Sequence, residues 1–343
     1  MKKVSVVTAV FNRANLIERT IISLLSQTYS NWEHIIVDDG STDNTVNVIE
    51  EYSQTDDRIK LFHRGTLMKG SNTCRNIGIR ESRGDYIIFL DSDDTLSSFC
   101  LQQRVSLMSI NPNCDFMVFP GIYKQIESED YCPDNYLISS YFYKNKGESI
   151  VSLFINLDVP WMPSSPIYLR EKLLQNDIYF DEDIIKFQDI VFHIKVLCSQ
   201  LKFDVVKSNI KPDHFWVAHK YSSIGKTNAN IDILQSNIIV IKRIISILAM
   251  NGFDTLIDAK VFFRLLWLTF YIHSFCINED EEKKKSCLYL SELKNFRLPY
   301  NCLNMVSRIP NVFLRKLFMK ILLLYKKKNK YFLKTKMSKI YKF

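Results

Sequence analysis

Short apolar runs alternate with amphipathic segments along the first 120 residues, and this alternation restricts the folds open to the chain. Val4–Val10 is a continuous valine-rich run, as expected of a strand buried on both faces. Four more runs have strand length: His34–Val37, Ile59–Phe62, Tyr86–Leu90 and Asp115–Phe119. Helical patterns separate them, so we predict an α/β fold with a mostly parallel sheet flanked by helices.

The helices expected between these strands have recognisable first and last residues. Asn15 is expected to cap a helix through Gln27, with Glu18 in capping-box spacing. Helices are also expected at 42–52, capped by Thr42 or Asp43, at 71–82, stopped by Gly84, and at 97–110, opened by Ser97 or Ser98.

The second part of the chain is less regular and then becomes helical. Residues 120–160 give little signal. A helix is expected near Asp189–Leu197, followed by short strands at 203–206 and 215–218 and by helices at 231–250 and 259–276. The run 279–285, four acidic residues followed by three lysines, is interpreted as a solvated loop or a helix end. We therefore expect a domain over residues 1–228 and a helical C-terminal region over residues 229–343.

Acidic residues follow two of the predicted strands directly. Asp38-Asp39-Gly40 follows the second strand, and Asp91-Ser92-Asp93-Asp94 follows the fourth. Because parallel sheets bind ligands at the carboxyl ends of their strands, both clusters are expected at one edge. Two carboxylates one residue apart suit a hard cation whose remaining positions are filled by phosphate oxygens. Each cluster alone is equally explained by a solvated turn or a helix cap.

Five ordered sequence blocks make the first 120 residues similar to the family 2 glycosyltransferases. The blocks are Val4–Asn12, Ser26–Tyr29, Ile36–Asp43, Cys74–Gly78 and Gly84–Asp94. The similarity is strong over about residues 3–120 and weakens through about 225. It implies a GT-A fold and an inverting transfer of a sugar from a nucleotide-diphosphate donor, usually a UDP-sugar, with Mg²⁺ or Mn²⁺ as cofactor.

The resemblance also implies roles for individual residues. Asp39 would bind the nucleobase, in a pocket lined by Ala9 and Phe11, and Arg75 would contact the nucleotide. In the second acidic cluster, Asp91 would contact the ribose together with Ser92, and Asp93 would bind the metal. His219 would be a further metal ligand; an ordinary surface histidine is the alternative.

The catalytic base of the family usually belongs to a Glu-Asp pair at the start of a helix. The matching residues are Gln188 and Asp189, so Asp189 is the expected base, with Asp181 and Asp183 as rivals and a helix cap as the structural alternative. Without a carboxylate at position 188, the pKa of Asp189 should be lower than in a Glu-Asp pair, since like charges raise it.

Three residues resemble the wall that faces the donor sugar and the acceptor. Trp161 offers an aromatic face to a sugar ring, and Ser164 and Ser165 follow it closely. A tryptophan buried in the core is an equally good interpretation of the first of them.

Several other motifs argue against different classes of protein. Gly225-Lys226-Thr227 lacks the spacing and context of a P-loop, and no GxGxxG is present. The eight cysteines form no CxxC pair, so we expect reduced thiols in a cytosol rather than disulfides or zinc. A nucleotidyltransferase would need a glycine-rich, lysine-bearing N-terminal loop that the sequence does not contain.

The end of the sequence is strongly basic. Residues 308–343 hold 12 Lys or Arg and no acid, so the other 307 residues carry a net charge of −4 within a total of +8. Between Val312 and Tyr325 the few basic residues cluster on one helical face, which is typical of a membrane-surface anchor. No stretch reaches the roughly 18 apolar residues that a membrane span needs. We therefore expect a cytoplasmic protein, peripheral on the inner face of the plasma membrane, with no nucleic-acid partner.

The expected partners are a nucleotide-sugar donor and a saccharide or lipid-linked acceptor in surface polysaccharide or glycolipid assembly. The amphipathic pattern of the basic tail has an alternative interpretation, because a helix packed on the rest of the protein, or a homodimer formed through the C-terminal helices, would show the same pattern. The alternative function is a catalytically silent nucleotide-sugar-binding subunit of a polysaccharide assembly complex, which only the change from Glu to Gln188 supports.

Overall fold

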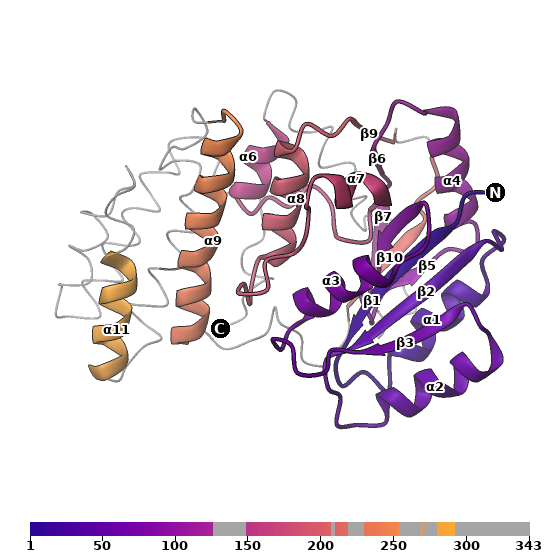
Figure 1. The fold of residues 1–343 in the computed structure, drawn as a ribbon, viewed down its shortest axis with the longest axis horizontal. Coiled ribbons are helices and arrows are strands. Elements are labelled where there is room, and N and C mark those ends of the chain that lie inside the picture. Colours follow the sequence, from indigo (N-terminus) through magenta and orange to yellow (C-terminus); the bar gives the residue numbers. More distant parts are fainter. Residues whose placement is uncertain (126–148, 207–209, 219–229, 254–268, 270–279, 292–343) are drawn as a thin grey trace.

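The core of the molecule is one seven-stranded mixed sheet (Figure 1). The computed structural model describes residues 1–125, 149–206, 210–218, 230–253, 269 and 280–291. The strands lie in the order β3 (Ile59–His63), β2 (Trp32–Asp38), β1 (Val4–Val10), β4 (Tyr86–Phe89), β8 (Pro166–Leu169), β6 (Phe116–Val118) and β9 (Phe203–Val205). The first four are mutually parallel, and only β8 runs against its neighbours. The mostly parallel sheet is therefore confirmed.

Two apolar clusters cover the two faces of this sheet. Alternate residues of β1 divide between them: Val7 belongs to one cluster, and Val6 and Val10 to the other. One face is covered by α1 (Ile17–Leu25), α2 (Thr45–Thr55) and α4 (Cys100–Ile110). The other is covered by α3 (Ser71–Glu81), α6 (Ile150–Ile155), α7 (Arg170–Gln175) and α8 (Gln188–Cys198), and α9 (Ile231–Met250) joins the same apolar cluster by packing on α8.

The close packing of α3 on β1 has a local cause. A Cβ placed on Gly78 would come within 2.2 Å of Val7 Cγ1, so only glycine lets the helix lie this near the strand. This approach brings the first turns of α3 to the carboxyl ends of β1 and β2, where the acidic clusters lie.

A small second sheet lies beside the main one. It contains β5 (Thr95–Leu96), β10 (His214–Ala218) and β7 (Gly121–Gln125), with β10 in the middle, antiparallel to β5 and parallel to β7. β5 begins directly after the acidic cluster that ends at Asp94. The cluster is therefore held between the two sheets, with β4 of the main sheet before it and β5 of the second sheet after it. The sequence indicated neither β5 nor β7.

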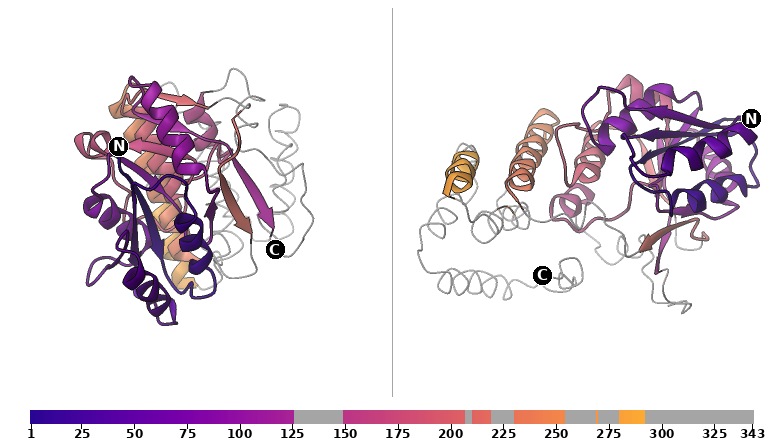
Figure 2. Two further views of the ribbon diagram at one scale, coloured as in Figure 1. Left: turned by 90° about the vertical axis from the view of Figure 1, so that its right-hand side faces the viewer. Right: turned by 90° about the horizontal axis from the view of Figure 1, so that it is seen from below.

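The described C-terminal helices extend the molecule away from the sheet (Figure 2). α9 packs between α8 and α11 (Asp280–Ser291). Residues 280–285 of the charged run form the N-terminal half of α11, in agreement with the helix-end alternative. Among the described residues, α9 alone is long and apolar enough to cross a membrane, with a mean hydropathy of 1.7, which corrects the expectation that no stretch qualifies. Because 61% of that window is buried inside the molecule, α9 is better explained as a core helix.

Helix starts were less well predicted than helix positions. The residue before α1 is Leu16 rather than Asn15, and α4 follows Phe99 rather than a serine. α3 ends at Glu81, before Ser82 and not at Gly84. The four helices nevertheless lie where the apolar pattern placed them. The helix expected at 259–276 falls outside the described residues, except for Thr269.

Candidate active site

The carboxyl ends of four parallel strands form the rim of the candidate site. Val10 of β1 lies opposite Asp38 of β2, and Asp38 lies opposite His63 of β3. On the other side of β1, Val7 pairs with Phe89 of β4, two residues before Asp91. The two acidic clusters therefore share one edge of the sheet, as the strand pattern predicted.

The two aspartates of the first cluster have different environments. Asp38 accepts hydrogen bonds from the amides of Gly40 and Ser41 at 2.9 and 3.0 Å, so it holds the turn. Asp39 is 6% exposed, and its Oδ1 accepts from Arg64 Nε at 2.6 Å and from the Gly70 amide at 2.9 Å. The Arg64 ion pair fixes the Asp39 carboxylate at the rim. The sequence did not single out Arg64.

The end of β1 supplies an aromatic side chain to the same rim. Phe11 is 36% exposed, and Lys69 Nζ lies 4.3 Å from the centre of its ring. Asn12 takes the left-handed conformation at φ 51°, and its Oδ1 accepts the amide of Thr42 at 2.8 Å. This contact ties the Phe11 turn to the Asp39 turn. Ala9 lies in β1, two residues before Phe11, and is partly buried against the core.

The second acidic cluster is linked to α3 by an ion pair. Arg75 Nη2 donates to Asp91 Oδ1 at 2.8 Å, and its guanidinium lies 5.1 Å from the centre of the Phe180 ring. The Arg75 side chain is only 8% exposed, whereas that of Asp91 is 34% exposed. The buried Arg75 therefore neutralises the charge of the Asp91 carboxylate and leaves that carboxylate accessible to solvent. Ser92 is buried, and Asp93 is half-buried.

Asp94 anchors the acidic turn to the second sheet. It is 2% exposed, and its Oδ1 accepts the amide of Val217 in β10 at 3.0 Å. Its carbonyl oxygen accepts from Thr20 of α1 at 2.8 Å. Burial, together with the charges of Asp91 and Asp93, raises the pKa of Asp94 well above that of a free aspartate. Three carboxyl groups are thus concentrated at this turn.

Asp189 enters the site from α8. It lies in the first turn of the helix and is half-buried, and its Oδ1 accepts the amide of Ile190 at 2.9 Å. Burial raises the pKa of Asp189, opposed by the Ile190 hydrogen bond and by the positive charge of Arg75, while Asp91 adds to the rise. Phe180 connects Arg75 to α8, because its ring lies 5.1 Å from the Arg75 guanidinium and stacks on Phe192 of α8 at 4.0 Å.

The local backbone before α8 is strained. Phe187, which precedes the helix, has φ 65° and ψ 21°, a left-handed conformation that costs a bulky residue about 1 kcal/mol or more. Gln188 places no carboxylate beside Asp189. The pKa of Asp189 is above its ordinary value even without that carboxylate, since burial outweighs the Ile190 hydrogen bond and the charge of Arg75. The rivals are engaged elsewhere: Asp181 pairs with Lys195 and Asp183 with Arg243.

Cys74 connects the two halves of the site. The buried thiol has a pKa raised to about 12, mainly by burial, and it also feels the charges of Asp39, Arg64 and Arg75. The ion pair at the first cluster and the Arg75 ion pair at the second therefore both act electrostatically on the same residue of α3.

Trp161 lies in the core rather than at this rim. It is 2% exposed, packs edge-on against Phe154, and donates from Nε1 to Nδ1 of His193 at 3.3 Å. The indole ring is thus surrounded by the core cluster. The role of a sugar-facing wall for Trp161 is not supported by this geometry, and the core alternative fits it.

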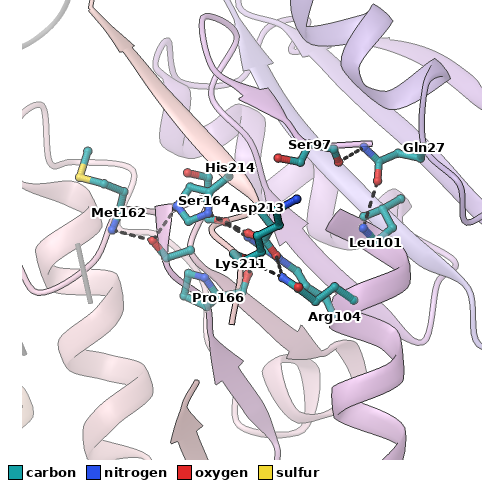
Figure 3. Close-up of polar contacts among 12 residues, drawn as sticks. Gln27, Ser97, Leu101, Arg104, Met162, Ser164, Pro166, Lys211, Asp213 and His214 are labelled. Carbon is teal, nitrogen blue, oxygen red and sulfur yellow. Dashed lines mark hydrogen bonds and ion pairs between the residues drawn. The ribbon is translucent and has the colours of Figure 1, made fainter. Parts of the chain in front are cut away.

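Ser164 and Ser165 belong to a buried polar network, most of which is drawn in Figure 3. Arg104 forms a two-pronged ion pair with Asp213 at 2.8 and 2.7 Å, and its Nη1 donates to the Ser164 carbonyl at 2.9 Å. His214 bridges Asp213 and Ser165 Oγ at 3.0 and 3.1 Å. All five residues are at most 1% exposed, so neither serine can contact a substrate in this arrangement.

The acidic turn fits a divalent cation. Asp91 and Asp93 offer hard carboxylate oxygens, which Mg²⁺ and Mn²⁺ prefer, whereas Asp94 is buried, has a pKa raised well above the usual range and anchors the turn. Within the described residues no three His, Cys, Asp or Glu side chains form a complete metal site. A metal held by one or two carboxylates takes its other ligands from substrate phosphates and water. His219 lies outside the described residues.

A parallel nucleotide-binding sheet with an acidic turn after β4, backed by a small second sheet, defines the GT-A class of glycosyltransferases. Residues 5–161 match the model of Glycosyl transferase family 2. The chain therefore carries a family 2 glycosyltransferase domain with the GT-A fold.

Proteins similar to the chain include several bacterial glycosyltransferases. An uncharacterized glycosyltransferase, EpsJ of Bacillus subtilis, is 32% identical over 192 residues, 56% of this chain and 55% of that protein. The cholesterol galactosyltransferase of Borreliella burgdorferi is 24% identical over 278 residues, 78% of this chain and 73% of that protein. The chain spans 31–55% of the length of the first three curated relatives.

Solved structures share the fold at low sequence identity. S. aureus TarS 1–349 in complex with UDP-GlcNAc superposes with a TM-score of 0.64 at 19% identity, covering 88% of this chain and 83% of that one. A mannosyltransferase from Pyrobaculum calidifontis in complex with GDP-Man and Mn²⁺ gives a TM-score of 0.50 at 16% identity, covering 89% and 79%.

Proposed function

We propose that the protein is an inverting glycosyltransferase that moves a sugar from a UDP-sugar to an acceptor hydroxyl, with Asp189 as the general base. The supporting observation is that Arg75, which is paired with Asp91, contacts Phe180, whose ring stacks on Phe192 of the helix that carries Asp189. Arg75 and Asp91 both act on the pKa of Asp189, although they lie about 100 residues or more away in the sequence. A base must lie within reach of the proton that it removes and have a pKa suited to the task. The raised pKa of a half-buried carboxyl meets the second condition.

The first cluster is suited to recognise the nucleobase. Asp39, paired with Arg64, is a fixed carboxylate that accepts hydrogen bonds. It therefore favours a base with a ring N–H on its pairing edge, which uracil has and cytosine and adenine lack. Phe11 offers an apolar surface beside it. This arrangement supports a UDP-sugar over a CDP- or ADP-sugar as the donor.

The second cluster is suited to the diphosphate. Asp91 and Ser92 would contact the ribose, and Asp93 would hold Mg²⁺ or Mn²⁺. When bound, the cation neutralises the negative charge that develops on the leaving UDP. Arg75 adds a fixed positive charge next to Asp91. With the donor held in this way, Asp189 would accept the proton of the acceptor hydroxyl as that oxygen attacks the anomeric carbon. The attack would come from the side opposite the bond to UDP, which breaks as the new bond forms, so the configuration at that carbon is inverted.

The relatives point to surface polysaccharide or glycolipid assembly. One, 39% identical over 101 residues, is a Campylobacter jejuni glucosyltransferase acting on an undecaprenol-linked saccharide, and another is a putative teichuronic acid biosynthesis glycosyltransferase. We extend this class of acceptor, a saccharide or lipid-linked saccharide, to the chain. The basic residues of 308–343 would hold the enzyme at the inner membrane surface, near such an acceptor.

Asp189→Asn tests the assignment of the base. We expect UDP to bind as in the wild type, with Mn²⁺ present, while UDP release from UDP-Glc, UDP-Gal or UDP-GlcNAc falls by about 1,000-fold. Asp57→Asn is the matched control, because Asp57 is exposed and lies just before β3, at the end of the strand away from the site. Equal loss in both variants would reject Asp189 as the base. UDP binding without turnover in the wild type would favour the silent-subunit alternative.

A further inference from the structure

The segment that precedes the candidate base has no regular structure of its own, so other elements hold it. Residues 180–187 are the last part of the connection from α7 to α8 and end at Phe187 in its left-handed conformation. Only Gln188 separates that residue from Asp189. The direction of the Asp189 side chain therefore depends on what fixes this short connection.

Side chains of α3 fix its first half. Asn72 Nδ2 donates to the carbonyl oxygens of Asp181 and Ile184 at 2.6 and 2.8 Å. Asn76 accepts the amide of Phe180 at 2.9 Å and donates to its carbonyl oxygen at 3.0 Å. α3 also carries Arg75, so this half of the segment is tied to the helix that contacts the second acidic cluster.

A serine of α9 fixes the second half. Ser236 is 1% exposed, and its Oγ accepts the amides of Ile185 and Lys186 at 3.0 and 3.3 Å. These are the last two amides before the left-handed residue. A buried amide that loses its acceptor is costly, so Ser236 holds the chain where α8 must begin.

A second contact from α9 lies two helical turns further on. Arg243 is seven residues after Ser236 and therefore on the same face of the helix. Its guanidinium contacts Asp183 at 3.2 Å and Asp181 at 3.5 Å, and Asp181 also pairs with Lys195 of α8 at 2.8 Å. Arg243 is 41% exposed, so its contribution is smaller than that of the buried serine.

We propose that α9 positions the catalytic base, with Ser236 as the main positioning residue and Arg243 as an auxiliary one. α9 lies side by side with α8 in Figures 1 and 2, and the two helices share the same apolar cluster. The helix that follows the expected boundary at 228 is thus a working part of the active site. The inference rests on the proposed function, because it takes Asp189 as the base.

Ser236→Ala tests the inference by separating kcat from donor binding. We expect kcat for UDP release from UDP-GlcNAc with Mn²⁺ to fall about 10- to 100-fold, because a displaced Asp189 carboxylate removes the proton less efficiently. The donor KM and the affinity for UDP should stay near wild-type values, since the nucleotide contacts come from other elements. Ser236→Thr, which keeps the hydroxyl, should restore kcat.

Two further variants control for effects on folding. Ser246→Ala makes the same change in α9 at a residue whose hydroxyl contacts only Met250 Sδ among the described hydrogen bonds, and it should leave kcat unchanged. Arg243→Gln removes the auxiliary contact at a partly exposed position and should lower kcat less than Ser236→Ala does. Equal losses from Ser246→Ala and Ser236→Ala would overturn the proposal.

Amide hydrogen exchange gives a readout that needs no donor. In Ser236→Ala, exchange should accelerate at Ile185 and Lys186 and leave the Asp39 turn unaffected. Unchanged exchange at these two amides, or an unchanged kcat, would overturn the role of α9. If UDP with Mn²⁺ fails to stabilise the wild-type protein, the proposed function fails instead, while the exchange result still decides whether α9 holds the segment.

Discussion

Three aspartates of the site differ in their surroundings, and each is suited to a different role. Asp39 is paired with Arg64 and remains an acceptor. Burial, together with the charges of Asp91 and Asp93, raises the pKa of Asp94 well above the usual range, and Asp94 anchors the turn by accepting the Val217 amide. Asp189 is half-buried at the start of a helix, where its raised pKa suits a base.

The raised pKa of Asp189 predicts the pH dependence of turnover and of stability. Turnover should fall as pH drops through the folded-state pKa, because the protonated carboxyl cannot accept a proton. A carboxyl whose pKa is raised by folding makes the fold less stable as pH rises above the unfolded value of 3.8. Asp189→Asn should therefore unfold at a higher temperature than the wild type at pH 8.

The check is thermal unfolding of both proteins across a pH series, alongside a pH-rate profile of the wild type. The difference in Tm should shrink as the pH falls through the folded-state pKa and level off below 3.8, where the carboxyl is protonated in both states. A lower Tm for Asp189→Asn at pH 8 would mean that the ionised carboxylate stabilises the fold, contrary to its burial.

Among single residues, the sequence pointed to the acidic residues and Arg75 as site residues, but the sugar-facing role predicted for Trp161 does not fit its burial in the core. An aspartate directly after a buried strand has a position fixed by the strand. A tryptophan in an irregular stretch does not, because a core ring and a sugar-facing ring have the same local sequence. Arg64 and Asp94 were missed as anchors because their partners, Asp39 and Val217, lie 25 and 123 residues away.

The strands carry a stabilising charge cluster at the end of the sheet away from the site. Glu33 of β2 is buried and accepts from Lys3 and Lys60 at 2.9 and 2.8 Å and from Ser5 at 2.6 Å. The Arg83 amide donates to it at 2.7 Å. Although burial alone would raise the pKa of Glu33, these hydrogen bonds lower it to about 2. One side chain thus joins three strands and a turn.

Glu33→Gln should destabilise the fold in a pH-dependent way. A pKa lowered from 4.5 to about 2 contributes up to about 3 kcal/mol, present above pH 4.5 and lost as pH falls toward 2. Urea unfolding at pH 7 and at pH 3 should show the difference between variant and wild type narrowing at pH 3. Glu50→Gln, at an exposed position of α2, is the control. An equal difference at both pH values would contradict the linkage.

Elements with long periodic patterns were predicted best. α9 has the expected bounds of 231–250, because twenty residues of helical periodicity outweigh local ambiguity. β8 was missed, since it has four residues, begins with proline and is inserted antiparallel between β4 and β6. Its pairing depends on partners about 50 and 80 residues away, which local pattern does not reveal.

The whole molecule joins the nucleotide-binding sheet to the C-terminal helices through one apolar cluster. Val7 of β1, Phe192 of α8 and Ile241 of α9 belong to the same buried group. A boundary at 228 therefore falls between parts that share a core, and we expect residues 1–228 to need α9 for a stable fold. The basic tail differs, since its charge is opposite in sign to that of the rest of the chain.

Removal of residues 308–343 should separate membrane binding from turnover. The full chain should sediment with vesicles containing phosphatidylglycerol, since each basic residue near an anionic surface contributes about 1 kcal/mol. Neutral phosphatidylcholine vesicles should bind little, and high salt should release the protein. The shortened chain should stay in solution and release UDP from a soluble UDP-sugar at the wild-type rate. Equal binding of both chains to anionic vesicles would place the membrane contact elsewhere, and loss of turnover on truncation would favour the packing or dimer interpretation of the tail.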